Sequence, residues 1–291
     1  MAPLTDGQLA DFQTAFDWRT GYALPDGRPL GVPGKRGDVA RGVDPRVQAV
    51  VERFAPAGKR ILEIGCCEGG HTVQLAAVCG EVVGLDVRPH NVAGALIRSF
   101  AHGVRNARFA LADVRELGHE FGTFDIVFHV GVLYHLDDPA GHLARIAALA
   151  PDLILDTHYA NDTLAWPEVT ASHAGRHYAA KRYREGGWED VFSGVQPTST
   201  WLMRDDLLRL IGDVGYRTVE VIDDRNERNG PRLTLVARRP ADPIERGLPA
   251  ATDADGWKAR AFALEGKLAT VQSSLAWRIG RLLTAPLRRA G

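Results

Sequence analysis

The chain has 291 residues, a length that suits one domain with additions or two small domains. Its 35 basic and 36 acidic side chains give a formal net charge of -1, so no global field draws it to nucleic acid or to an anionic membrane. No apolar run reaches the roughly 18 residues of a membrane span, and the polar start MAPLTDGQLADFQ lacks the character of a signal peptide. The three cysteines lack the spacing of a zinc site or a disulfide framework. We therefore expect a cytoplasmic protein.

Residues 1–54 are expected to form an N-terminal cap. The stretch FDWRTGYALPDGRPLGVPGKR predicts a hairpin on its Pro-Asp-Gly turn, followed by a basic glycine-rich loop that could close over a bound ligand. Lys35 and Arg36 in that loop are candidates for an anionic substrate group, although solvated loop charges are the more common case.

Residues 55–240 show the alternation that is typical of a parallel α/β sheet. The expected strands are ILEIG, EVVGLD, ARFALAD, FDIVFHVG and DLILDT, and the helical stretches among them are HTVQLAAV, NVAGALIRSF and AGHLARIAALA. A further helix, MRDDLLRLIGDVG, precedes the runs YRTVEVID and RLTLVARR, which the turn ERNGP joins. The prediction is an α/β fold whose sheet is mostly parallel, with a C-terminal antiparallel hairpin at its edge.

The segment ILEIGCCEGG ends a strand in a bend of small residues, and Asp86 ends the next strand, twenty-one residues after Gly65. A small-residue turn lets the backbone approach a ligand closely, and a carboxylate at the next strand tip can bind a ribose diol. The spacing of the small residues differs from GxGxxG, so the turn by itself is a weak signal. Together the two features predict a nucleoside-binding domain.

Four further features carry a family resemblance: the EIGC turn, Asp86, the third-strand ALAD and the segment FDIVFHVGVLYHLDDP. With the order of elements, they resemble the class I S-adenosylmethionine-dependent methyltransferases over roughly residues 55–238. GVLYH is the most specific string, and it is similar to the branch that includes the tRNA wobble-uridine modifying transferases and many small-molecule and glycan methyltransferases. The resemblance implies a Rossmann-like methyltransferase sheet and S-adenosylmethionine as cofactor.

The resemblance also implies a cofactor site. It places the methionine part over Glu63, Gly65, Cys66 and Gly69, and the ribose hydroxyls on Asp86. Asp113 and Val114 would bind the adenine edge, and Val130 with Gly131 would form the floor below the sulfonium. Tyr134 would contact the cofactor. Cys67 departs from the family, which usually has a glycine there; we interpret this small residue as tolerated.

Two histidines follow strand ends, where open α/β sheets bind ligands, and are the candidate general bases: His135 and His158. His135 could instead cap its loop. His129 is expected to be a core histidine, and Asp138 with Pro139 to start a helix. The carboxylates Asp156, Asp223 and Asp224 have no fixed metal spacing, so no metal is expected.

Residues 158–203 lack a clean period, are rich in aromatic and basic residues, and are expected to be a substrate cap inserted in the domain. Half of the aromatic residues could merely pack the cap onto the sheet. The candidate substrate residues are Trp166, His177, Tyr178, Arg182, Tyr183, Trp188 and Trp201.

Residues 241–291 are expected to form a linker and an amphipathic C-terminal helix with heptad-spaced apolar residues and a basic end. Its SSLAWRIGRLLTAPLRR resembles tails of bacterial surface-glycan glycosyltransferases and their companion enzymes. Homodimer formation, peripheral contact with the inner face of the membrane and packing on the chain's own domain are the alternatives.

Three functions remain open. The first is O-methylation of a hydroxyl on a saccharide, such as a surface-glycan precursor, or on another small metabolite. The second is tRNA wobble-uridine modification, which the charge disfavours because tRNA binding normally needs a basic face. The third is a non-catalytic protein that retains the cofactor fold. The sequence does not distinguish O- from N- or C-methylation.

Overall fold

The computed structural model describes residues 4–32, 42–118 and 121–240. They fall into two units: residues 4–32, and the remainder, which we call the sheet unit. Lys35, Arg36 and the whole tail, residues 241–291, lie outside the described residues, so the predictions made for them stay predictions.

The smaller unit is a helix followed by a hairpin. Thr5 caps α1 (Asp6–Ala15) through its hydroxyl. β1 (Gly21–Ala23) pairs antiparallel with β2 (Pro29–Gly31), and Gly27 takes a φ of 85° in the turn between them. Glycine adopts this left-handed conformation without steric cost. The expected hairpin on the Pro-Asp-Gly turn is therefore confirmed.

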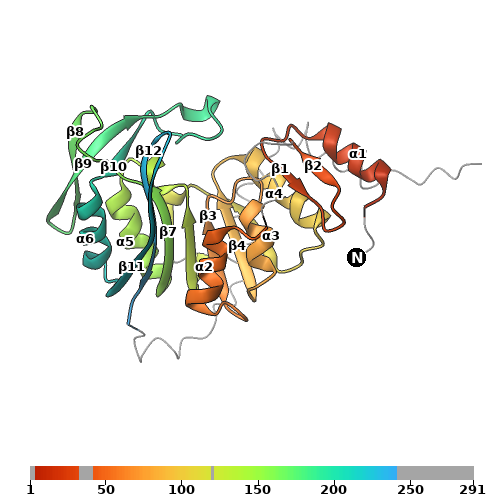
Figure 1. The fold of residues 1–291 in the computed structure, drawn as a ribbon, viewed down its shortest axis with the longest axis horizontal. Helices are drawn as coiled ribbons and strands as arrows, with labels where there is room; N and C mark the ends of the chain where they lie inside the picture. The colour runs from red at the N-terminus through yellow and green to blue at the C-terminus, as the bar shows by residue number, and fades with distance from the viewer. Residues whose placement is uncertain (1–3, 33–41, 119–120, 241–291) are drawn as a thin grey trace, which may run out of the picture. The chain divides into compact units, whose positions relative to one another are not determined.

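The sheet unit is built on a seven-stranded sheet in the order β11-β12-β7-β6-β3-β4-β5 (Figure 1). β3 to β7 run parallel, β12 is antiparallel to β7, and β11 is antiparallel to β12. The strands are β3 (Arg60–Ile64), β4 (Glu81–Asp86), β5 (Ala107–Leu111), β6 (Ile126–Val130), β7 (Asp152–His158), β11 (Thr218–Glu227) and β12 (Gly230–Arg238). The predicted parallel sheet with a C-terminal antiparallel hairpin at its edge is confirmed.

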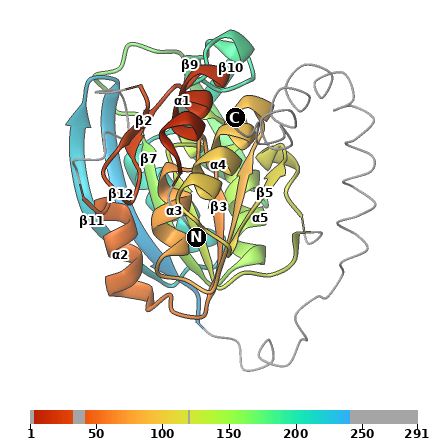
Figure 2. The same cartoon turned by 90° about the vertical axis from the view of Figure 1, so that its right-hand side faces the viewer.

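Helices cover both faces of this sheet (Figure 2). On one face lie α2 (Pro45–Phe54), α3 (Gly70–Ala76) and α4 (Pro89–Ala101), and on the other α5 (Pro139–Leu149) and α6 (Arg204–Asp213). α5 begins as predicted, with Asp138 accepting a hydrogen bond from the Gly141 amide at 2.8 Å and Pro139 in the first turn.

Strand side chains alternate between the two faces. On β6, Ile126 and Phe128 pack in the core beneath α2 and α3, whereas Val127 packs beneath α5, and all three are fully buried. Burial on both faces explains why these strands appear in the sequence as continuous apolar runs. The sheet therefore holds the carboxyl ends of its parallel strands rigidly at one edge.

α2 belongs to the sheet unit, because Val47 and Val50 are fully buried in the core on its face of the sheet. The boundary between the two units consequently falls before α2, and not after residue 54 as the sequence suggested. In the described part of the chain, no helix has the length and apolar character needed to cross a membrane.

Between β7 and α6 the chain forms a second, three-stranded antiparallel sheet, which we call the cap sheet. Its strands, in the order β10-β9-β8, are β8 (Glu168–His173), β9 (Arg176–Arg184) and β10 (Thr198–Leu202). Ala171 and Ala180 on its inner face share a core with α5 and α6. The sequence showed no strand pattern here because alanine occupies inward positions, and alanine is depleted in strands.

Candidate active site

The turn after β3 brings the backbone close to the neighbouring strand ends. Gly65 and Gly69 have φ values of 71° and 76°, and a side chain on Gly65 would collide with Val132. Cys66 is buried, and Cys67 adopts a φ of 49°, in the left-handed region. Cys67 therefore holds the backbone conformation that favours glycine, at the position where the resemblance expects one.

Glu63 lies at the base of this turn, almost fully buried. One carboxyl oxygen, Oε2, accepts a hydrogen bond from the Thr72 hydroxyl at 2.5 Å, while Oε1 has no hydrogen-bond partner among the described residues. Burial raises the pKa of Glu63 to about 8; the Thr72 hydrogen bond opposes this shift and the Asp86 carboxylate reinforces it. A buried carboxyl oxygen without a partner suits a cationic ligand group.

Asp86 ends β4 and faces the same turn. Its carboxylate accepts hydrogen bonds from the Cys67 amide at 2.9 Å, the Arg88 amide at 2.9 Å and the Asn91 side chain at 3.1 Å. Burial raises the pKa of Asp86, although these donors oppose the shift. The carboxylate is thus oriented by the turn itself and retains acceptor capacity for a hydroxyl.

The other cofactor candidates lie at the ends of the adjoining strands. Asp113 follows β5 and its carboxylate is held by Arg115, whose Nε lies 3.0 Å from both carboxylate oxygens; the next residue, Val114, is buried. Val130 ends β6, and Gly131 follows it with a φ of 77°. A Cβ on Gly131 would lie 3.9 Å from the Tyr134 hydroxyl, so Tyr134 points at this strand end.

An aromatic cluster adjoins Tyr134. His158 stacks on Trp201 with ring centroids 4.9 Å apart and an interplanar angle of 16°. Tyr134 meets the edge of His158 at 4.7 Å, and Trp166 and Tyr183 lie 4.9 Å and 5.3 Å from Trp201. Side chains from the turn after β6, the end of β7, the loop before β8 and the cap sheet therefore converge at one place.

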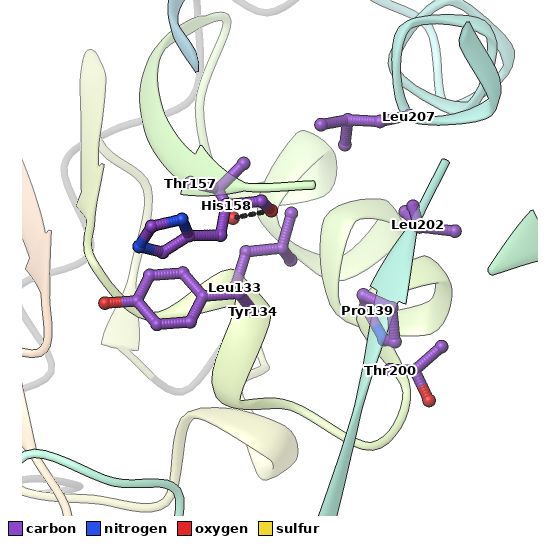
Figure 3. A pocket seen from close by; sticks show the side chains of 8 residues that line it. All are labelled: Leu133, Tyr134, Pro139, Thr157, His158, Thr200, Leu202 and Leu207. Carbon is purple, nitrogen blue, oxygen red and sulfur yellow. Dashed lines mark hydrogen bonds between the residues drawn. The ribbon is translucent and has the colours of Figure 1, made fainter. Parts of the chain in front are cut away.

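A small pocket adjoins this cluster (Figure 3). It is lined by Leu133, Tyr134, Pro139, Thr157, His158, Thr200, Leu202 and Leu207. The rings of His158 and Tyr134 lie side by side with their polar tips directed away from Pro139 and Leu202 (Figure 3). The chemically useful atoms thus face away from the apolar part of the pocket.

His158 ends β7, and its ring is fixed by the turn of the hairpin. Nδ1 donates to the Pro231 carbonyl at 3.0 Å, which leaves Nε2 as an acceptor. Burial lowers the pKa of His158, and the Arg232 guanidinium lowers it further. This imidazole is therefore neutral at pH 7 and poorly suited to taking up a proton.

His135 has a different environment. It lies in the short 3-10 turn Leu133–His135, and its Nδ1 is 3.0 Å from a carboxylate oxygen of Glu185, the residue directly after β9. A carboxylate can only accept, so Nδ1 carries the proton and Nε2 is left to take another. The ring centroids of His135 and Tyr134 are 4.1 Å apart, so His135 also adjoins the cluster.

Four substrate candidates do not join the cluster. Tyr178 is fully buried, with its hydroxyl donating to Asp213 at 2.9 Å, so its ring packs the cap sheet and is not open to a substrate. Arg182 projects from the opposite face of β9 to Tyr183 because side chains alternate along a strand. His177 lies six residues from Tyr183, about 20 Å along the strand. Trp188 is exposed, and its ring lies under the Arg88 guanidinium.

The three carboxylates considered for a metal are held by arginines. Asp156 is fully buried and accepts from Arg225 Nη2 at 3.1 Å and from Arg232 Nε at 2.7 Å. Asp223 pairs with Arg225 at 2.6 Å, and Asp224 pairs with Arg204 Nε at 2.8 Å. Asp156 binds the hairpin to β7, Asp223 pairs within β11, and Asp224 binds β11 to α6.

Residues 62–151 match a family model described as a methyltransferase domain. Among solved structures, the crystal structure of the N-terminal domain of EvdMO1 with SAH bound is 26% identical, with a TM-score of 0.68 over 81% of this chain and 98% of that one. The fold is a Rossmann-like methyltransferase fold. A second crystal structure of that domain, in the presence of SAH and D-fucose, is 27% identical with the same TM-score.

Curated methyltransferases match a shorter region. A ubiquinone biosynthesis O-methyltransferase of Xanthomonas axonopodis pv. citri is 31% identical over 105 residues, which are 36% of this chain and 44% of the relative. A tRNA U34 carboxymethyltransferase of Alcanivorax borkumensis is 38% identical over 116 residues, 36% of each protein. The chain thus aligns with less than half the length of these two relatives, and the acceptor must be argued from its own residues.

The methyltransferase fold also presents two functional candidates that the sequence did not indicate. Glu185 and Arg88 are both buried charged residues, one on the cap sheet and one after β4. In the sequence they resemble ordinary polar residues of a strand end and a helix start. Their hydrogen-bond partners lie about 50 and 100 residues away along the chain, so these contacts can be recognised only in the tertiary structure.

Proposed function

We propose that this protein is an S-adenosylmethionine-dependent methyltransferase that methylates a hydroxyl group of a saccharide or a similar small metabolite. The supporting observation is that two histidines and an aromatic cluster surround Tyr134, whose hydroxyl points at Gly131 beside the nucleoside-type turn. One short stretch of chain thus adjoins both the cofactor residues and the acceptor residues.

The residues of the turn fit the cofactor. Oε1 of Glu63 accepts no hydrogen bond from the described residues, although His71 Nδ1 lies 4.0 Å from it; this oxygen would accept the ammonium group of the methionine part, and Asp86 the ribose hydroxyls. Asp113 and Val114 would hold the adenine edge, and Val130 with Gly131 would form the floor. When bound, S-adenosylmethionine would supply an electrophilic methyl group whose departure leaves the electron pair on sulfur.

His135 is the better candidate for the general base. A proton taken up at its Nε2 would be stabilised by the Glu185 carboxylate, 3.0 Å from Nδ1. At His158, burial and the Arg232 guanidinium oppose the same event and outweigh the Glu227 carboxylate, whose Oε2 lies 3.8 Å from Nε2. We therefore assign proton removal to His135, and to the neutral His158, whose Nε2 accepts, a hydrogen bond from a second hydroxyl of the acceptor.

The aromatic cluster fits a saccharide acceptor. Trp166 and Tyr183 are only partly buried and could present ring faces to the apolar side of a sugar, with Trp201 behind them. The indole N–H of Trp201 has no hydrogen-bond partner within the described ranges, so it is a donor that remains to be satisfied. The EvdMO1 domain crystallised in the presence of D-fucose is consistent with this acceptor class.

A tRNA wobble-uridine activity is the second candidate, because tRNA U34 carboxymethyltransferases are among the relatives and GVLYH is typical of that branch. The net charge of -1 weighs against it, since tRNA binding normally requires a strongly basic face.

Transfer of label from methyl-labelled S-adenosylmethionine separates these functions. The full chain would be incubated with free sugars, nucleotide sugars, lipid-linked glycans or bulk tRNA. Label is expected in a saccharide and absent from tRNA. Label in tRNA alone would favour the second candidate, and binding of S-adenosylmethionine without transfer to any acceptor would support a non-catalytic protein.

A further inference from the structure

Glu185 is a buried carboxylate directly after β9, 7% exposed, and it accepts hydrogen bonds from four residues. Besides His135, it accepts from the Ser193 hydroxyl at 2.5 Å, the Gly194 amide at 2.7 Å and the Ser199 hydroxyl at 2.6 Å. Burial would raise the pKa of Glu185, but hydrogen bonds from His135, Ser193 and Ser199 outweigh it and lower the pKa to about 2. The side chain is therefore an anion held in one orientation.

The loop that supplies these donors is fixed at its other side by Arg88. The buried Arg88 guanidinium donates to the carbonyls of Trp188 at 2.8 Å, Gly187 at 2.9 Å, Asp190 at 2.9 Å and Ser193 at 3.1 Å. The Arg88 amide in turn donates to Asp86. The loop between β9 and β10 therefore joins the end of β4 to the turn after β6.

This geometry sets the state of the histidine. Neutral imidazole carries its proton on either nitrogen, and only the Nδ1–H form can donate to a carboxylate. A rigid anion beside Nδ1 therefore selects that form and fixes the ring plane. Nε2 is then the nitrogen with a free electron pair.

We propose that Glu185 is a positioning residue that holds His135 in the Nδ1–H form, so that the cap sheet supplies half of a base dyad. The inference rests on the proposed function. In the step it serves, the acceptor hydroxyl gives its proton to Nε2 of His135 while its oxygen bonds the methyl carbon, and the bond from that carbon to sulfur breaks with its electron pair left on sulfur. Glu185 stays ionised and faces the resulting imidazolium.

A purely structural role for Glu185 is the alternative, since its other bonds order the loop. Two variants distinguish the roles. Glu185→Gln keeps the shape, but its amide can donate to Nδ1 and so favour the Nε2–H form. Ser199→Ala removes one hydrogen bond from the same carboxylate and leaves the contact with His135 intact.

The first measurement is ¹⁵N NMR of the histidine rings in the full chain, which identifies the protonated nitrogen without any substrate. Wild type and Ser199→Ala are expected to show His135 protonated at Nδ1, and Glu185→Gln to show a shift toward Nε2–H. A wild-type His135 protonated at Nε2 alone would overturn the proposal, even if Glu185→Gln failed to fold.

The second measurement is methyl transfer. Glu185→Gln is expected to lower kcat about 10²-fold or more with little change in KM or in cofactor affinity, because it removes an effect on the base. Ser199→Ala should lower kcat no more than about tenfold, the scale of one net hydrogen bond. Equal losses in both variants would mean that Glu185 only orders the loop. If no acceptor is ever methylated, the proposed function fails, and the NMR result still decides the dyad.

Discussion

Nε2 of His129 and Nε2 of His142 lie 2.8 Å apart, joining β6 to α5, and both side chains are fully buried. Nδ1 of His142 donates to the Val114 carbonyl at 3.0 Å, so its Nε2 must accept from His129. The expected core histidine at position 129 is thereby confirmed, and its partner fixes which nitrogen carries the proton. The hydrogen bond from His142 Nδ1 holds Val114, a candidate for binding the adenine edge, against the core.

This pair should make stability depend on pH. Burial lowers the pKa of His129 to about 4 and that of His142 well below its usual value. The unfolded chain takes up these protons near pH 6.5, so stability is fully present above that pH and falls as the pH drops toward 4. Urea unfolding at pH 7, 6 and 5 should show a loss that is small above pH 6.5, steepens below it and approaches about 3 kcal/mol per pH unit from the pair near pH 5.

The variant His142→Gln should reduce that slope by about half of the pair's contribution. His102 and His158, whose pKa values are also lowered, add to the slope of unfolding free energy against pH in both proteins. The test is therefore the difference in slope between wild type and His142→Gln. An identical slope in both would contradict the assignment.

Cofactor binding should release a proton from Glu63. Its pKa of about 8, raised by burial, means that the carboxyl is protonated in the free protein at neutral pH, whereas an ammonium group prefers the ionised form. The affinity should therefore rise as the pH rises from 6 toward 8, by up to about tenfold per pH unit. Calorimetry in buffers of different ionisation enthalpy measures the released proton directly, and Glu63→Gln should abolish both effects. A pH-independent affinity would argue against an ammonium at Glu63.

Asp86→Ala should weaken cofactor binding by about 10-fold to 100-fold, the range expected for lost hydrogen bonds to a charged group. Asn91→Ala provides the control, because Asn91 donates to Asp86 at 3.1 Å and its loss keeps the carboxylate in place. Calorimetric titration with S-adenosylmethionine compares the two. Equal affinity in Asp86→Ala and wild type would remove the ribose contact from the proposed site.

The two histidines should respond differently to replacement. His135→Ala should lower kcat about 10²-fold or more, with cofactor affinity nearly unchanged. His158→Ala should mainly raise KM, because a neutral imidazole stacked on Trp201 holds the acceptor without taking its proton. Steady-state kinetics with the acceptor that the enzyme methylates tests both variants. A large loss of kcat in His158→Ala with only a raised KM in His135→Ala would assign the base to His158.

The left-handed conformation of Cys67, with a φ of 49°, carries strain of about 1 kcal/mol or more that glycine would relieve. Glycine also makes the unfolded chain more flexible, which costs a similar amount. Cys67→Gly should therefore stay within about 0.5 kcal/mol of wild type in urea unfolding. Cys79→Gly, at a cysteine without positive φ, should lose about 1 kcal/mol, because it makes the unfolded chain more flexible and relieves no strain. Similar losses in both variants would show that Cys67 is not strained.

The sheet could be predicted from the sequence, because strands buried on both faces must be continuous apolar runs and the helices between them must be amphipathic. The turn from Glu63 to Gly69 and the position of Asp86 could also be predicted, because each lies at the end of a strand whose apolar run can be recognised in the sequence. Local chain geometry fixes these features within a few residues.

The roles of the histidines and of the cap depend on contacts between distant parts of the chain. His135 and His158 look alike in the sequence, and they differ because Glu185 approaches one of them from the loop after β9 and Arg232 the other from β12. Trp201 joins the aromatic cluster while Tyr178 packs in the core, because strand pairing decides which face of the cap sheet each residue occupies. Electrostatics and burial act between residues far apart along the chain, so no local pattern records them.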